Sequence, residues 1–213
     1  MKVVLLHAFP LDERMWERQR GIVPDAIAPR LYGRGRSMDA WAESIENEVE
    51  EELVLVGASM GGYCALALAR RAPERVRGVL LVGARPDADS EERREGRAAT
   101  IDLIRTEGPE ALWREMAPKL FADESRTDER LLYRDPDGLV SAVEAIRDRA
   151  DSTDVVRALG DRARFVIGEH DPFVSADELK DFDVCEIAGA GHLVNIEYPD
   201  EFNAELLEFL AGV

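Results

Sequence analysis

The sequence is poor in the residues on which disulfide frameworks and metal sites depend. Only two of its 213 residues are cysteine and three are histidine, and it has no Cys-x-x-Cys or His-Glu-x-x-His motif. We therefore expect no dedicated metal site and no disulfide framework. Both cysteines, Cys64 and Cys185, lie in apolar stretches, which favours reduced thiols in the core of a cytoplasmic protein.

Long hydrophobic runs and an excess of positive charge are also absent. The first apolar stretch, Val3 to Leu6, is interrupted by His7 and is too short for a signal peptide. No other run approaches the roughly 20 apolar residues of a transmembrane helix. The formal net charge is -17, and such an acidic chain is repelled by nucleic acids and anionic membranes. We therefore expect neither as a partner; the sequence does not indicate an oligomeric state.

What the sequence does contain is a series of short apolar runs. The chain is 46% hydrophobic, enough for one domain with a sizeable core. The runs are continuous rather than alternating, as in strands buried on both faces of a mostly parallel sheet, and helical patterns lie between several of them. They are Val3 to Leu6, Leu53 to Val56, Val79 to Val82, Phe165 to Ile167 and Val184 to Ile187. The expected helices include 39–52 and 199–210.

One segment, residues 85–159, interrupts this alternation. It contains no strand-like run, only charged amphipathic pieces at 90–106, 109–117 and 137–149. We predict that it is a helical cap inserted into a core formed by residues 1–84 and 160–213, and that it lies above the strand ends as a lid. Four apolar residues are candidates for its pocket side: Trp113, Met116, Leu120 and Phe121.

A serine surrounded by small residues follows the second apolar run. Ser59 lies in Gly-Ala-Ser-Met-Gly-Gly, between a strand-like run and a helix-like run that ends before Pro73. A serine on such a sharp strand-to-helix turn takes up strained backbone angles, and glycines let the helix pass close to the strand. The pattern predicts that Ser59 is a nucleophile.

A serine nucleophile needs a base, and the base needs an orienting acid. His192 lies in a glycine-rich loop after the last apolar run, and Asp171 follows the fourth run. Both are expected at the carboxyl ends of strands, where open α/β sheets bind their ligands. Asp87 and Asp89 follow the third run and are alternative acids. The other histidines, His7 and His170, also lie at strand ends; because Asp171 already fills the acid position, we expect His170 to be structural.

With these motifs in this order, the sequence resembles the serine hydrolases of the α/β-hydrolase fold. The resemblance covers almost the whole chain, and the order of nucleophile, acid and histidine is Ser59, Asp171, His192. The sequence is most similar to small bacterial esterases, cofactor-free haloperoxidases or perhydrolases, and 3-oxoadipate enol-lactonases. Unlike most members, the chain starts directly at the strand before His7, so we expect a smaller sheet without the usual N-terminal hairpin.

The resemblance implies an activity and a site. Small to medium carboxylic esters or lactones would be cleaved through an acyl-enzyme on Ser59, without a cofactor. The backbone N–H groups of Met60 and Phe9 would form the oxyanion hole. Perhydrolysis and carbon–carbon bond hydrolysis are alternatives on the same triad. A non-catalytic, ligand-binding member of the fold is a third alternative, because a fold alone does not determine function.

Overall fold

The computed structural model describes residues 1–213 and contains one sheet of five parallel strands, in the order β1-β2-β3-β4-β5. All five strands coincide with the apolar runs of the sequence, so the predicted α/β architecture is confirmed. Ile27 adds a parallel bridge to Val4, on the side of β1 away from β2. The strands are β1 (Lys2–Leu6), β2 (Leu53–Ala58), β3 (Val76–Val82), β4 (Ala163–Gly168) and β5 (Val184–Ile187).

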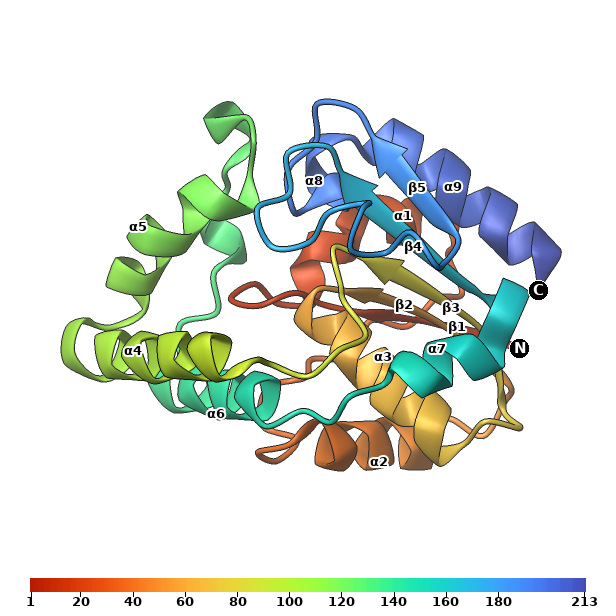
Figure 1. The fold of residues 1–213 in the computed structure, drawn as a ribbon, viewed down its shortest axis with the longest axis horizontal. Coiled ribbons are helices and arrows are strands. Elements are labelled where there is room, and N and C mark those ends of the chain that lie inside the picture. Colours follow the sequence, from red (N-terminus) through yellow and green to blue (C-terminus); the bar gives the residue numbers. More distant parts are fainter.

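Helices cover both faces of this sheet (Figure 1). On one face α3 packs against β1, β2 and β3, and α2 and α7 pack against α3. On the other face α9 packs against β4, with α1 and α8 beside it. The α-helices are α1 (Glu17–Ile22), α2 (Met38–Glu48), α3 (Met60–Arg71), α4 (Glu91–Glu107), α5 (Pro109–Leu120), α6 (Pro136–Arg147), α7 (Thr153–Leu159), α8 (Val194–Glu197) and α9 (Pro199–Gly212).

Four short 3-10 helices complete the secondary structure, and they lie in the connections. They are η1 (Glu13–Trp16), η2 (Glu124–Arg126), η3 (Glu129–Leu131) and η4 (Gly160–Arg162). No helix is both long enough and apolar enough to cross a membrane.

The core is divided by the sheet because successive side chains of a strand point to opposite faces. Along β2, Leu53 and Leu55 belong to the apolar cluster on the α3 side, whereas Val54 and Val56 belong to the cluster on the α9 side. All four are fully buried. A strand buried on both faces must be apolar at every position, which is why the runs in the sequence are continuous.

Helix α2 begins where the sequence predicts but ends earlier. The side chain of Ser37 accepts a hydrogen bond from the backbone N–H of Ala40 at 3.2 Å, as an N-cap residue does. The helix ends at Glu48 rather than at Glu52, because Val49 takes an extended conformation (φ -126°, ψ 119°). Val49 is buried in the core, and the chain turns there toward β2.

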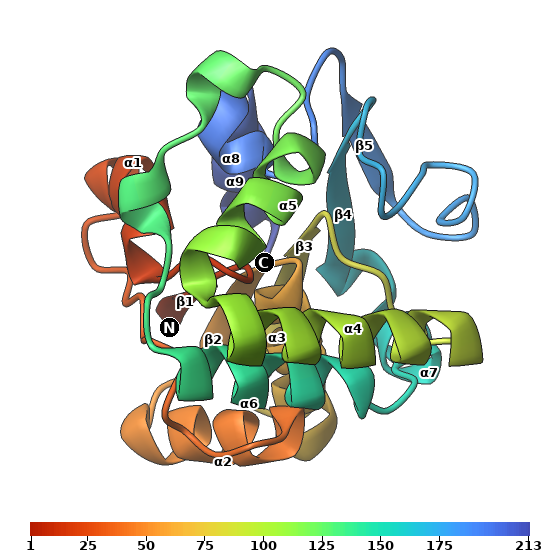
Figure 2. The ribbon, with the colours of Figure 1, turned by 90° about the vertical axis from the view of Figure 1, so that its left-hand side faces the viewer.

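Four α-helices and no strand lie between β3 and β4, within the predicted insertion. Viewed along the sheet, α4, α5 and α6 lie in front of the strands, with α4 beside α6 (Figure 2). The last helix of the segment, α7, packs against α3 of the core. The segment therefore combines helices over the strand ends with one helix that covers a face of the sheet.

Candidate active site

Ser59 lies at a strained turn between β2 and α3. Its backbone angles are φ 48° and ψ -111°, and it is the one residue other than glycine with a positive φ. Such angles cost of order 1–3 kcal/mol and are held only by the surrounding structure. One such support is a 2.7 Å hydrogen bond from the backbone N–H of Ser59 to the carbonyl of Val82 on β3.

Glycines next to the turn allow the backbone segments to approach each other. A Cβ atom at Gly61 would lie 2.1 Å from the carbonyl oxygen of Leu6, and a Cβ atom at Gly57 would lie 2.5 Å from the carbonyl oxygen of Gly61. No side chain fits at either distance. The small residues around Ser59 are therefore required by the close passage of α3 over β1 and β2.

His192 and Asp171 are joined by a short hydrogen bond. The distance from His192 Nδ1 to Asp171 Oδ2 is 2.8 Å, and the side chains are 3% and 0% exposed. The other carboxylate oxygen of Asp171 accepts a hydrogen bond from the backbone N–H of Phe173 at 2.8 Å. The ring of Phe173 stands edge-on to the imidazole, with centroids 4.7 Å apart. The bond leaves the Nε2 atom of His192 for another partner.

The alternative acids make different contacts. Asp87 is bound by Arg85 and Arg93, at 2.6 and 2.9 Å. Asp89 is fully buried and is bound by Arg97 and Arg149, at 3.0 and 2.6 Å. The structure therefore places both carboxylates among arginines, and Asp171 is the one hydrogen-bonded to His192.

The remaining histidines lie outside this pair. His170 is exposed, with its Nε2 atom 4.0 Å from Glu169. His7 is fully buried; its Nε2 accepts a 2.9 Å hydrogen bond from the backbone N–H of Leu31, so its Nδ1 carries the proton, 3.1 Å from the carbonyl of Ala8. Burial lowers the pKa of His7 to about 4, because the charged form loses its hydration.

A buried glutamate holds the loop that carries His192, and the sequence motifs did not reveal it. Glu197 is 2% exposed. Its two carboxylate oxygens accept hydrogen bonds from the backbone N–H groups of Gly191, at 2.7 Å, and Asp123, at 2.9 Å. The residue before His192 is thus tied to the segment that follows α5.

Ser59 and His192 line the same cavity, which has a volume of about 310 Å³. Phe9, which follows β1, and Phe173, which follows β4, also line it. These residues come from four different strand ends, as expected for a ligand site in an open α/β sheet. The volume lies at the small end of the range for small-molecule sites, about 300–1,000 Å³.

The four apolar cap residues selected from the sequence divide into two pairs. Met116 and Leu120 line the cavity, whereas Trp113 and Phe121 do not. The rings of Trp113 and Phe121 pack edge to face, with centroids 6.4 Å apart, and both belong to the apolar cluster on the α9 side of the sheet. These two residues are therefore part of the core packing rather than of the cavity wall.

The backbone N–H groups of Met60, which follows Ser59, and of Phe9 have no acceptor within the chain. Met60 is the first residue of α3, and a helix offers no acceptor to its first N–H groups. The N–H of Phe9 donates to no acceptor in the chain. By contrast, the N–H of the preceding residue, Ala8, points to the sulfur of Met15 at 3.1 Å.

Cationic side chains form part of the cavity wall, and sequence reasoning did not select them. Arg85, Arg93, Arg97 and Lys119 line the cavity. The spacing of Arg93 and Arg97 along α4 places them on one face of that helix. This spacing was visible in the sequence, but the direction in which the face points was not.

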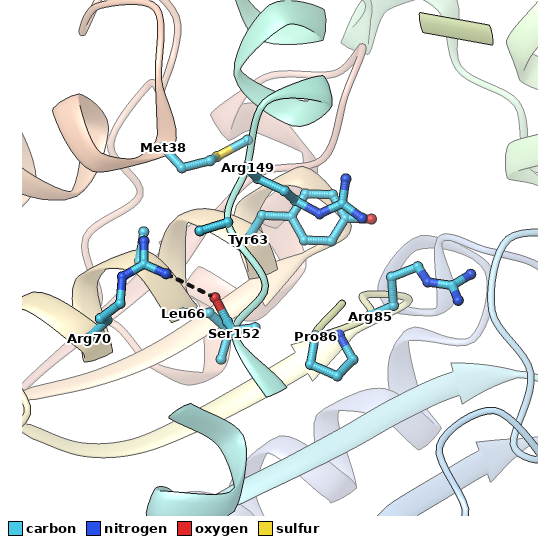
Figure 3. A pocket seen from close by; sticks show the side chains of 10 residues that line it. Met38, Tyr63, Leu66, Arg70, Arg85, Pro86, Arg149 and Ser152 are labelled. Atoms are coloured by element: carbon cyan, nitrogen blue, oxygen red, sulfur yellow. Dashed lines mark hydrogen bonds between the residues drawn. The ribbon is translucent and has the colours of Figure 1, made fainter. Parts of the chain in front are cut away.

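A second cavity, of about 10 Å³, lies behind Tyr63 and Arg149. Figure 3 shows the guanidinium of Arg149 lying over the ring of Tyr63; the distance from its carbon to the ring centroid is 4.1 Å. The same view shows the hydrogen bond from Arg70 to Ser152, 3.3 Å long. Tyr63 and Arg85 line both this small space and the larger cavity.

The cysteines and acidic residues form no metal-ligating or redox cluster. Cys64 and Cys185 are free thiols. Burial raises the pKa of Cys64 to about 12 and that of Cys185 to about 11, because the thiolate form is disfavoured in an apolar environment. No group of three or more histidine, cysteine, aspartate or glutamate residues is arranged to hold a metal ion.

Comparison with known sequences gives two kinds of match. A sequence model described as the alpha/beta hydrolase family matches residues 3–205. The pimeloyl-[acyl-carrier protein] methyl ester esterase of Aromatoleum aromaticum is 33% identical over 93 residues, which cover 39% of this chain and 37% of that protein. The matched stretch therefore spans less than two thirds of that relative's length.

Comparison with solved structures gives likenesses along the whole chain. A thermophilic esterase from Thermogutta terrifontis superposes with a TM-score of 0.87 at 29% identity, covering 100% of this chain and 90% of that one. The enol-lactonase of Burkholderia xenovorans LB400 superposes with a TM-score of 0.81 at 24% identity, covering 99% and 91%. At 24% identity, the similarity to the enol-lactonase shows a shared fold only.

Proposed function

This chain belongs to the α/β hydrolase family, and we propose that it is a carboxylic ester hydrolase that cleaves small to medium esters or lactones through an acyl-enzyme on Ser59. The family expected from the sequence motifs is confirmed. The observation that carries the proposal is that Ser59, on its strained turn, lines one cavity with His192. The Nδ1 atom of that histidine is hydrogen-bonded to buried Asp171.

In the proposed reaction Ser59 Oγ attacks the carbonyl carbon of the ester. His192 Nε2 takes the hydroxyl proton and then gives it to the leaving alkoxide oxygen as the ester bond breaks. Asp171 holds the imidazole with Nδ1 protonated and stabilises the imidazolium. A water molecule then attacks the acyl-enzyme with His192 as the base, releasing the carboxylic acid and restoring Ser59.

Two backbone donors would stabilise the negative charge on the carbonyl oxygen. The N–H groups of Met60 and Phe9 suit this role, because neither is used by the fold. Each such donor contributes about 3 kcal/mol to lowering the barrier. The hydrogen bond of Ala8 to Met15 supports Phe9, rather than Ala8, as the second donor.

We also propose that residues 85–159 act as a cap over this site. Residues of α4 and α5 line the cavity together with Ser59. A cap of this kind excludes water and shapes the pocket, so that substrate choice depends on its side chains.

The cytoplasmic location inferred from the two unpaired cysteines stays a prediction.

The test is active-site labelling combined with ester turnover. We expect a fluorophosphonate to label the wild-type protein and p-nitrophenyl esters of short acyl chains to be hydrolysed. The Ser59→Ala variant should fold normally, fail to label and lose several orders of magnitude in kcat/KM. Equal labelling of both proteins, or no labelling of the wild type, would contradict the proposal and would leave a ligand-binding role.

A second set of assays distinguishes the reactions that the same triad could perform. Peracid formation and diketone cleavage, measured on the same preparation as ester and lactone hydrolysis, separate the three enzymatic hypotheses. We expect ester or lactone turnover to have the highest kcat/KM. A higher value for either of the other reactions would replace the esterase assignment without affecting the role of Ser59.

A further inference from the structure

We propose that the ester accepted by this site carries a second, ionised carboxylate, which Arg97 binds. The preferred substrate is then a monoester of a dicarboxylic acid, or a lactone bearing a carboxylate. This inference rests on the proposed function, because it concerns the substrate of the same cavity. It is based on which atoms of the cavity wall have partners and which do not.

One face of α4 forms a wall of the cavity. Arg93, Gly96, Arg97 and Thr100 all line it, and their spacing places them on adjacent turns of the same helix face. At Gly96 a Cβ atom would meet no atom within 4 Å, so the backbone there borders open space. The face offers two guanidinium groups, which are donors suited to a carboxylate, whereas the hydroxyl of Thr100 already donates to the carbonyl of Gly96 at 3.0 Å.

The hydrogen bonds of these arginines leave donors unused. Arg97 donates through Nε to Asp89 at 3.0 Å, and its two terminal nitrogens have no partner in the chain. Arg93 donates through Nη2 to Asp87 at 2.9 Å and through Nε to the hydroxyl of Ser90 at 3.3 Å, and its buried Nη1 makes no hydrogen bond but lies 4.0 Å from Asp89. The terminal nitrogens of Arg97 are therefore the unused donors of this face, and the carboxylate of a ligand would give them partners.

The charges around the cavity also leave a positive excess. Four arginines (Arg85, Arg93, Arg97 and Arg149) share three carboxylates (Asp87, Asp89 and Glu178) in one network, whose two halves are joined by a 4.0 Å contact between Arg93 and Asp89. Lys119, the other cation of the wall, is paired with Glu115 at 3.2 Å. Arginines therefore outnumber carboxylates by one within this network, which does not include the Asp171 carboxylate bonded to His192, although the chain as a whole carries -17. An excess of this sign attracts anions.

Among the four arginines, Arg97 is the best placed to bind the carboxylate. Arg85 uses all three of its nitrogens, on Asp87, Phe173 and Glu178. Arg149 is 3% exposed and does not line the large cavity. The terminal nitrogens of Arg97 can take a carboxylate in the two-pronged geometry that guanidinium groups favour.

The rest of the cavity suits the carbon chain that would connect the two ends of such a substrate. Phe9, Met116, Leu120 and Phe173 supply apolar surface to the wall. An apolar wall with a few fixed polar groups is the usual design of a site that orients a small ligand. The ester end would lie at Ser59 and the carboxylate end at α4.

The experiment compares esters that differ in one negative charge. Monomethyl esters of succinic, glutaric and adipic acid are assayed, each against its dimethyl ester, and the measured quantity is the ratio of the two kcat/KM values. For the wild-type protein we expect the best monoester to be preferred. In Arg97→Gln the ratio should fall about 10- to 100-fold, because a charge-assisted interaction is lost. Arg97→Lys keeps the charge but loses the planar pair of N–H donors of the guanidinium group, so it should give an intermediate ratio.

The matched control is Arg105→Gln, which removes the same charge from the same helix. Arg105 is exposed and does not line the cavity, so its ratio should equal that of the wild type. Thermal unfolding of each variant checks that folding is intact. Asp89 keeps its bond to Arg149 when Arg97 is replaced, so we expect Arg97→Gln to fold.

The outcomes separate this inference from the proposed function. If the wild type cleaves dimethyl esters as well as monoesters, or if the ratio in Arg97→Gln equals that in Arg105→Gln, the carboxylate inference is wrong and the esterase assignment stands. If no ester is cleaved and the fluorophosphonate does not react, the proposed function fails, and the inference with it.

Discussion

The hydrogen bond between His192 and Asp171 determines which imidazole nitrogen can act on Ser59. The bond uses Nδ1 at 2.8 Å, and a carboxylate acceptor there fixes the tautomer with the proton on Nδ1. The free Nε2 atom is then unprotonated and able to accept the serine proton. Because Asp171 also accepts the backbone N–H of Phe173, its orientation is set by the loop rather than by the histidine alone.

Replacing Asp171 by asparagine should therefore impair catalysis without unfolding the chain. Asparagine keeps the shape of aspartate, but it can present its N–H₂ group to the imidazole and favour the wrong tautomer. We expect kcat on p-nitrophenyl acetate to fall by roughly 10⁴-fold. Asp87→Asn is the matched control, because Asp87 is bound to arginines, and it should retain most of the turnover. The reverse pattern would make Asp87 the acid of the triad.

At the scale of elements, one buried ion pair connects the loop after β3 with the end of α6. Asp89 and Arg149 lie 2.6 Å apart, with side chains 0% and 3% exposed. Arg149 also donates to the backbone carbonyl of Asp87 at 2.9 Å and stacks on Tyr63 of α3 (Figure 3). A single guanidinium thus links the helix of the nucleophile with the helices above it.

Removing this guanidinium should lower stability more than removing an exposed one. In Arg149→Met the buried carboxylate of Asp89 keeps only its partners on α4, and we expect the free energy of unfolding in urea to fall by about 3 kcal/mol. The matched control is Arg130→Met, because Arg130 pairs with Asp128 while its own side chain is 88% exposed. This change should lower the free energy of unfolding far less, because exposed ion pairs contribute little to stability. Similar losses in both variants would show that the buried pair is not the link described.

Helix α5 shows what helical periodicity can and cannot predict about a pocket. Its sequence predicts an apolar face, and that face is buried. Trp113, Met116 and Leu120 are all compatible with a pocket, yet only Met116 and Leu120 line the cavity. Trp113 instead packs edge-on against Phe121, which follows the helix, in the apolar cluster on the α9 side of the sheet. Helical periodicity assigns residues to a face but does not say what the face meets.

For the molecule as a whole, the distribution of charge matters more than its sum. The whole chain has a net charge of -17, whereas the wall of the cavity next to Ser59 contains arginines. Partly buried charges are screened by salt less than exposed ones. The acidic composition therefore does not predict a site that repels anions.

The stability of the whole chain should depend on pH through His7. Its pKa is about 4 in the folded chain, against 6.5 for an ordinary histidine, so between these values the unfolded chain binds more protons. The contribution of neutral His7 to the free energy of unfolding is therefore complete above pH 6.5 and is lost as the pH falls. By pH 4 the contribution of His7 to the free energy of unfolding should have dropped by about 3 kcal/mol.

The measurement is urea unfolding at several pH values for the wild type and for His7→Gln. Glutamine can accept the N–H of Leu31 but does not titrate, so the wild type should lose about 3 kcal/mol more than the variant between pH 6.5 and 4. Carboxylates contribute equally to both proteins and cancel in the difference. Parallel pH profiles would show that His7 does not carry this dependence.

The sequence by itself determined the five strands, their parallel sheet and the family, because buried strands and a serine turn require particular residues at adjacent positions. It also placed Ser59, Asp171 and His192 at strand ends, since the order of strands and loops can be read along the chain. Only the tertiary structure decided that Asp171 rather than Asp87 bonds to His192. Only the tertiary structure shows which face of α4 lines the cavity, because contacts between distant segments depend on packing that no local pattern encodes.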